Sequence, residues 1–146
     1  MRFSFTKKDI EKIAKVLGID LKKIGDCYRG VLENHESNRR LSLEIYSKIP
    51  IGKQIGNLIS VYTPNAHLQL HFCTGYVVSE SLGEVTFIGE FQGRLSGLIV
   101  EKGASCSLYA NVDRSILSGD FTQLGPEVML SGIALSLTEQ VLPASR

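Results

Sequence analysis

Polar side chains that could do chemistry occupy every second position of one segment, His67, Gln69, His71 and Cys73. Alternate residues of a β-strand point to the same face, so a strand here would gather all four into a ligand-binding candidate. Imidazole and thiolate groups are common ligands of zinc and copper. The Cα atoms of His67 and His71 would be roughly 13 Å apart, too far to share one ion. His71 and Cys73 remain as metal-ligand candidates, but two ligands do not make a site, so we expect no metal or cofactor.

Established catalytic motifs are missing from the sequence. His71 and Cys73 are a base and a nucleophile in type, but neighbours two apart on a strand seldom reach hydrogen-bonding distance, and no cysteine-enzyme motif surrounds Cys73. There is no G-x-S-x-G sequence, and the glycines at 93–97 fit a hairpin rather than a phosphate-binding loop. The sequence therefore favours a protein that is not an enzyme.

Charge is divided unevenly along the chain although the net charge is only +1. Residues 1–53 carry 12 Lys and Arg against 7 Asp and Glu, a balance of +5, and residues 54–146 carry 4 against 8, a balance of −4. Such an asymmetry is typical of a surface that meets a partner, or simply of a solvated helix face. The candidates for a basic partner-facing surface are Lys8, Lys12, Lys15, Lys22 and Lys23.

Residues 9–23 have the outline of a helix-turn-helix, with two helices meeting at Leu17–Asp20. A DNA reader also needs a recognition helix and a clearly basic surface. Here Asp26 and Glu33 accompany the basic residues of the second segment, and the pI is about 7.7. We therefore expect two helices that pack on a sheet, with DNA binding as an alternative and nucleic acid not among the expected partners.

The composition is that of a globular protein. Of 146 residues, 43% are hydrophobic and 21% are charged, and no apolar run approaches the roughly 18 residues needed to cross a bilayer. The first residues lack the apolar region of a secretory signal, and the three cysteines show no paired spacing. These features predict a cytoplasmic protein with reduced thiols and no membrane span.

Helices are predicted at the N-terminus. Thr6 and Asp9 form a capping box, apolar residues follow at helical spacing, and Gly18 suits the position after a helix, which predicts a helix over 7–17. A second helical segment follows Asp20, although Gly25 and Gly30 weaken it. A short strand from Cys27 to Glu33 is the competing interpretation.

From Arg39 to Val112 the hydrophobic period changes to two and predicts an antiparallel meander. Turns expected at Gln92–Gly93 and Lys102–Ala104 make sequential strands pair. Glycines inside the strands favour a strongly curved sheet or a barrel. The six expected strands are Leu41–Ile49, Leu58–Thr63, His67–Val78, Glu84–Phe91, Arg94–Glu101 and Ser105–Val112.

The chain is predicted to be a single α+β domain. Residues 1–36 form its helical start, residues 39–112 its antiparallel core, and residues 113–146 a loop and a helix. The helix is expected at 127–141, because Pro126 suits a first helical position and an apolar stripe follows, although a strand also fits.

This pattern favours a small accessory or regulatory module that acts through a protein partner, as an assembly or regulatory factor of a larger complex. Missing catalytic motifs, the split charge and edge strands left available by the hairpins motivate that hypothesis. The main alternative is a small barrel or cupped sheet that binds an apolar small molecule. Self-association is left open.

Overall fold

The structure is a computed structural model that describes residues 3–91 and 94–113, in which one helix precedes nine strands. In chain order the elements are α1 (Lys7–Leu17), β1 (Lys22–Ile24), β2 (Cys27–Asn34), β3 (Arg39–Ile51), β4 (Gln54–Tyr62), β5 (His67–His71), β6 (Cys73–Ser79), β7 (Glu84–Phe91), β8 (Arg94–Glu101) and β9 (Ser105–Asp113). The expected helix at 127–141 and the expected turn at Gln92–Gly93 lie outside the described residues.

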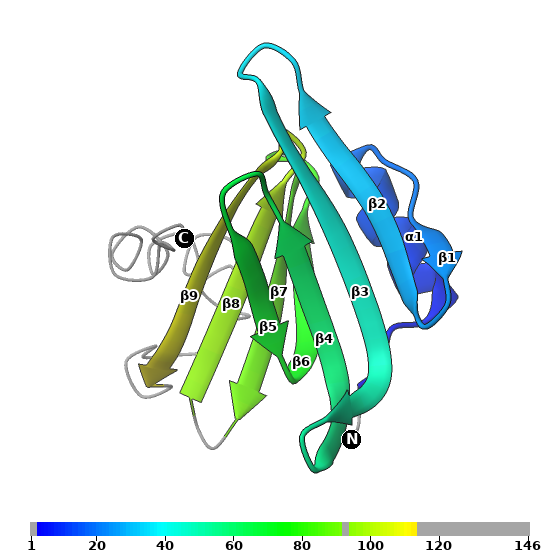
Figure 1. Ribbon diagram of the computed structural model, residues 1–146, viewed down its shortest axis with the longest axis vertical. Coiled ribbons are helices and arrows are strands. Elements are labelled where there is room, and N and C mark those ends of the chain that lie inside the picture. The colour runs from blue at the N-terminus through cyan, green and yellow to red at the C-terminus, as the bar shows by residue number, and fades with distance from the viewer. Residues whose placement is uncertain (1–2, 92–93, 114–146) are drawn as a thin grey trace.

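The strands form two antiparallel sheets in which each strand pairs with its neighbour in sequence. The first sheet has the order β1-β2-β3-β4-β5 and the second the order β6-β7-β8-β9 (Figure 1). The antiparallel, sequential pairing that the short hairpins predict is therefore confirmed. A closed barrel and a count of about six strands are wrong, because the meander divides into two open sheets.

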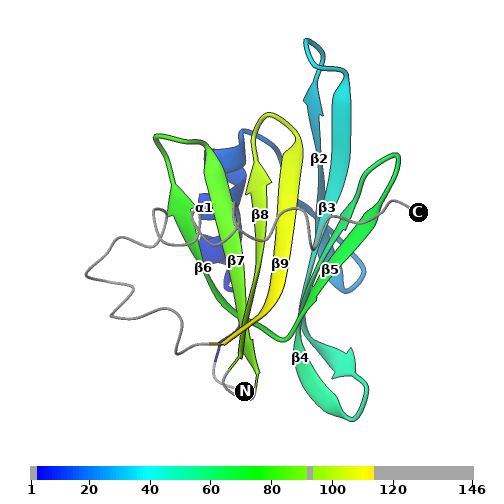
Figure 2. The ribbon, with the colours of Figure 1, turned by 90° about the vertical axis from the view of Figure 1, so that its left-hand side faces the viewer.

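The two sheets face one another across a common core. Inward-facing apolar side chains of β3, β4 and β5 belong to the same core cluster as those of β7 and β8. Helix α1 lies beside β6 and β7 (Figure 2) and adds its buried stripe to this cluster. The fully buried members include Ile13, Leu43, Ile59, Phe87 and Leu98. The space between the sheets is thus filled by side chains.

Helix α1 has the predicted ends. The Thr6 hydroxyl accepts a hydrogen bond from the Asp9 N–H at 3.2 Å, the Asp9 carboxylate accepts one from the Thr6 N–H at 2.8 Å, and Gly18 closes the helix with φ of 70°. The same carboxylate accepts a 2.6 Å hydrogen bond from the Tyr76 hydroxyl, which ties α1 to β6. Burial alone would raise the pKa of Asp9, but the bonds from Thr6 and Tyr76 outweigh it and lower that pKa.

Replacing Tyr76 with phenylalanine should lower the free energy of unfolding by about 1 kcal/mol at pH 7. Because the folded-state pKa of Asp9 lies below its unfolded value, this contribution is complete above roughly pH 4 and disappears as the pH falls through the folded value. Urea titrations at pH 7 and at pH 3 measure both quantities. The exposed Tyr62 serves as the control, since Tyr62→Phe should leave both values unchanged. A Tyr76→Phe deficit that persists undiminished at pH 3 would contradict this account.

The second predicted helix is wrong, because Lys22–Ile24 and Cys27–Asn34 are strands. Gly25, with φ of 62°, and Asp26 form a two-residue turn between them, a connection that suits an antiparallel hairpin. Residues of β2 then alternate, with Leu32 buried and Val31 exposed. The competing strand interpretation of Cys27–Glu33 is confirmed, since pairing with β3 outweighs a helical spacing that glycine already weakens.

The predicted strand His67–Val78 is also wrong as a single element, because the chain turns a corner at Phe72. This residue has φ of 59°, a left-handed conformation that breaks the pleat between β5 and β6. Gly56 accommodates the corner, since a Cβ atom at that position would lie 2.7 Å from the Phe72 ring. Beyond Phe72 the chain enters the second sheet.

Candidate partner-binding site

The four polar residues at 67–73 do not form one cluster. His67, Gln69 and His71 lie on the exposed outer face of β5, whereas Cys73 is fully buried at the start of β6. The left-handed backbone at Phe72 reverses the alternation on which the common face depended. The expectation that Cys73 shares a face with the other three is therefore wrong.

Each of the two histidines already has a local partner. The His67 Nε2 atom lies 2.7 Å from the Ser60 hydroxyl, and its ring stacks on Tyr62 at 4.1 Å between centroids. The His71 Nε2 atom lies 3.2 Å from the Gln69 side-chain oxygen. Because Ser60 is only 1% exposed, the Ser60–His67 pair offers no nucleophile to a substrate. Within residues 3–91 and 94–113, no three His, Cys, Asp or Glu side chains are grouped so that they could hold a metal ion.

Cys27 and Cys73 are buried free thiols, and Cys106 is a half-buried one. Burial raises the pKa of the Cys73 thiol to about 12, and that of Cys106 to about 11. Burial and the nearby Glu44 carboxylate also raise the pKa of Cys27. The Cys73 Sγ atom donates to the Gly75 carbonyl oxygen at 3.2 Å, so it acts as a packed core group.

Alkylation should reveal this protection directly. At pH 8 in the folded protein, we expect iodoacetamide to modify Cys73 at least about a hundredfold more slowly than in urea-unfolded protein, because the thiolate is suppressed and access is blocked. Mass spectrometry of peptides from a time course measures the rate at each cysteine. Equal rates for Cys73 in folded and unfolded protein would show that its side chain is accessible.

The predicted DNA-binding motif is absent. A helix-turn-helix requires a second helix after α1, and the residues that would form it are the extended strands β1 and β2. The two sheets do not close into a barrel, and Phe87 packs against Phe5 at 6.2 Å between ring centroids inside the core. In the described part of the chain, no helix has the length and apolar character needed to cross a membrane.

The predicted basic residues separate into two groups. Lys8, Lys12 and Lys15 are exposed on α1, whereas Lys22 and Lys23 are exposed on β1. The Lys23 ammonium lies 5.8 Å from the centre of the Tyr28 ring. Lys22 instead pairs in register with Arg29 of β2, which places two cations on one face of the sheet.

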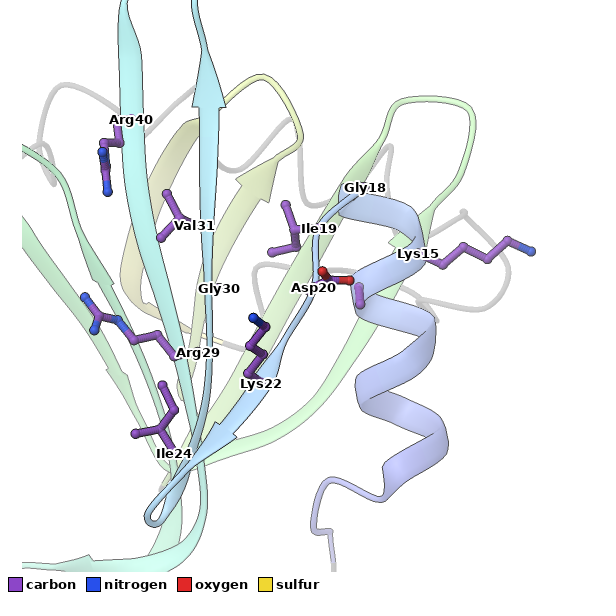
Figure 3. A pocket seen from close by; sticks show the side chains of 11 residues that line it. Lys15, Gly18, Ile19, Asp20, Lys22, Ile24, Arg29, Gly30, Val31 and Arg40 are labelled. Atoms are coloured by element: carbon purple, nitrogen blue, oxygen red, sulfur yellow. The ribbon is translucent and has the colours of Figure 1, made fainter.

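A groove of about 840 Å³ lies where the end of α1, β1 and β2 meet (Figure 3). Its cations are Lys22, Arg29 and Arg40, whereas the Lys15 side chain extends away from β2. Two exposed apolar side chains accompany them, Ile24 at 55% and Val31 at 37% exposure. The full lining is Ala14, Lys15, Gly18, Ile19, Asp20, Lys22, Ile24, Arg29, Gly30, Val31 and Arg40.

The chain between α1 and β1 forms one wall of this groove because β2 carries a glycine beneath it. A Cβ atom on Gly30 would lie 2.6 Å from the Asp20 carbonyl oxygen and 2.8 Å from the Ile19 side chain. Only glycine therefore permits this close crossing. The segment from Ile19 to Leu21 therefore lies over the inner face of β2. It does not pair with the edge of β2.

Carboxylates balance part of the positive charge. Arg29 lies 3.7 Å from Glu44, and Arg40 lies 3.2 Å from Glu33, both as ion pairs between partly exposed groups. The exposed Arg40–Glu33 pair contributes little to stability. Lys22 makes no salt bridge within the described residues.

Sequence reasoning selected Lys22 but missed Arg29 and Arg40. The alternation of buried Leu41 and Leu43 already places Arg40 on the outer face of its strand. Arg40 comes close to Lys22 only because β2 pairs with both β1 and β3. The sequence predicted a helix in place of β1 and β2, so it could not predict this pairing.

No protein-family model, curated protein sequence or solved structure matches the chain.

Proposed function

We propose that the protein is a non-catalytic accessory or regulatory module that binds a partner protein in the groove between the end of α1, β1 and β2. The observation that carries this proposal is the grouping of Lys22, Arg29 and Arg40 with exposed Ile24 and Val31 on one surface. Apolar contact area bordered by arginine is typical of protein interfaces. The small-molecule alternative has less support, since side chains fill the core and charged side chains line the groove alongside the apolar ones.

Site-specific photo-crosslinking in an extract of the source cells tests the proposal. A benzophenone amino acid at Ile24 should capture one polypeptide, whereas the same group at Leu82, which is 56% exposed, should not. Capture should fall at least about tenfold in a Lys22→Glu background, because the groove then loses a cation and gains an anion. Lys53→Glu changes the net charge equally at the exposed β3–β4 turn and should leave capture unchanged.

Three outcomes would overturn the proposal. They are equal capture at Ile24 and Leu82, capture that ignores Lys22→Glu, and capture only of a second copy of the chain. Native mass spectrometry of protein purified from its source supplies a further test, because a retained small molecule with no associated polypeptide would favour the ligand-binding alternative.

A further inference from the structure

Strand β2 is longer than the strand that covers its outer edge. β1 pairs only with Cys27, Tyr28 and Arg29, whereas β2 continues to Asn34. Beyond Arg29, the described residues supply no strand on that side, and the chain from Lys22 back to Gly18 leads toward α1 (Figure 3). The edge of β2 from Gly30 to Asn34 is therefore open along the groove.

The direction of the main-chain groups on this edge follows from the hairpin. In a two-residue turn, the flanking residues Ile24 and Cys27 form the hydrogen-bonded pair, so Cys27 and Arg29 direct their N–H and C=O groups toward β1. Because the direction of these groups alternates along a strand, the N–H and C=O groups of Val31 and Glu33 point to the open edge. Those of Leu32 point to β3. No main-chain partner outside the sheet occupies the Val31 or Glu33 groups among the described residues.

Natural proteins commonly protect such an edge with a bulge, a proline or a covering segment. The register of β2 against β3 is continuous from Cys27 to Asn34, so no bulge protects this one. The edge is extended and regular, with Val31 exposed at its centre. It presents main-chain donors and acceptors that an extended polypeptide can satisfy.

The charge beside the edge selects what can pair there. A strand added next to β2 would continue the line of β1. Its residue opposite Val31 would be displaced by two strand positions from Lys22, on the same face, and would be the diagonal neighbour of Arg29. A carboxylate there would lie near Lys22 and Arg29, which are paired in register on β1 and β2. Opposite Glu33 an acidic residue would be repelled, so an apolar residue fits better at that end.

We infer that the partner contributes an extended acidic segment, which adds to the open edge of β2 as a further strand. This inference rests on the proposed function and specifies its chemistry: main-chain hydrogen bonds to Val31 and Glu33, and a carboxylate directed toward Lys22 and Arg29. A nucleic acid fits less well, because phosphates cannot use an alternating row of N–H and C=O groups, and Glu33 and Glu44 border the site.

Amide hydrogen exchange of the full chain tests the binding mode with a defined probe, a short capped valine-rich peptide that carries glutamate at the position facing Val31 and valine at the position facing Glu33. Saturating peptide should slow exchange of the Val31 and Glu33 amides at least about tenfold, because these amides gain partners, while the Leu32 amide changes little. A peptide N-methylated at alternate residues, with the same charge, should bind about tenfold more weakly or worse. A peptide with lysine in place of glutamate should not bind.

Two protein variants complete the test. Val31→Pro removes the edge N–H and blocks pairing, while proline is tolerated on an edge whose N–H faces solvent, so the thermal midpoint should stay close to that of the parent. Val31→Thr keeps the N–H and the β-branched shape, so it should bind the peptide at least about tenfold more tightly than Val31→Pro does. If Val31→Pro does not fold, the N-methylated peptide still decides the question.

The result that overturns the inference is peptide binding that N-methylation does not weaken, or no slowing at Val31 and Glu33 under saturation. Binding of a single-stranded oligonucleotide that displaces the peptide and ignores Val31→Pro would also overturn it. Failure of this mode is distinguishable from failure of the proposed function. In the first case crosslinking at Ile24 still captures a Lys22-dependent polypeptide, and in the second it captures none.

Discussion

Replacing Asn57 with leucine should lower the free energy of unfolding by about 3–5 kcal/mol, the combined cost of losing four hydrogen bonds, one buried and three half-buried. Asn57 is fully buried, and its amide uses its whole hydrogen-bonding capacity. The Nδ2 group donates to the Phe3 and Cys73 carbonyl oxygens at 3.0 and 2.9 Å. The Oδ1 atom accepts from the Lys48 N–H and the Ser47 hydroxyl at 3.0 and 3.2 Å.

These bonds join three parts of the chain that no strand pairing connects. They are the segment before α1, the irregularity between Tyr46 and Ile49 in β3, and the first residue of β6. Leucine has a size similar to that of asparagine and fills the same space. The decrease in the free energy of unfolding therefore measures the contribution of the hydrogen bonds. Total stabilities of 5–15 kcal/mol are usual, so the variant should lie close to its unfolding midpoint.

Urea titration followed by circular dichroism measures the Asn57→Leu effect. Asn65 supplies a matched control, since it is exposed in the β4–β5 turn and its leucine variant should change stability by less than about 0.5 kcal/mol. A midpoint for Asn57→Leu equal to that of Asn65→Leu would show that the buried amide does not join these segments.

Replacing Phe87 with alanine should cost about 3–5 kcal/mol, the usual range for a buried phenylalanine in a packed core. Phe87 is fully buried on β7, where the second sheet meets the first. Its ring contacts Phe5 edge to face, and Phe5 in turn stacks on Tyr76 at 5.9 Å between centroids. The truncation therefore removes apolar area and loosens the segment that leads into α1.

Two further variants show whether the effect of Phe87→Ala comes from lost packing in the core. Phe87→Leu retains most of the volume and should cost less than the alanine change, whereas Leu82→Ala, at an exposed turn, should cost little. Denaturant titration of the three variants should give this order. A Phe87→Ala effect no larger than that of Leu82→Ala would mean that this ring does not support the core.

The parts of the fold that the sequence predicted are those with a local chemical signature. Thr6, Asp9 and Gly18 define both ends of α1, since capping depends on neighbours a few residues away. β7 and β8 were predicted with their observed bounds, because strict alternation and a tight turn need no distant information.

The errors arose where tertiary pairing outweighs a local pattern. Apolar residues such as Ile24, Tyr28 and Val31 recur at helical spacing in β1 and β2, yet the hairpin and β3 hold them extended. Phe72 adopts a left-handed backbone conformation, which glycine usually signals in a sequence. Because no glycine stands there, the alternating pattern predicted one continuous strand where the structure has two. The basic groove likewise depends on tertiary pairing, because the registers of β1 with β2 and of β2 with β3 bring Lys22, Arg29 and Arg40 together.

The bond between Asp9 and Tyr76 has a consequence for synthesis. The two residues are 67 positions apart, so at about 5–20 residues per second the helix waits on the order of 3–13 s before its partner strand is made. An isolated helix as short as α1 is marginal in water. Its apolar stripe of Ile10, Ile13 and Leu17 therefore emerges from the ribosome without a surface to cover it, while the hairpins behind it can form as they appear. The apolar stripe of α1 thus stays exposed on the nascent chain until β6 has been made.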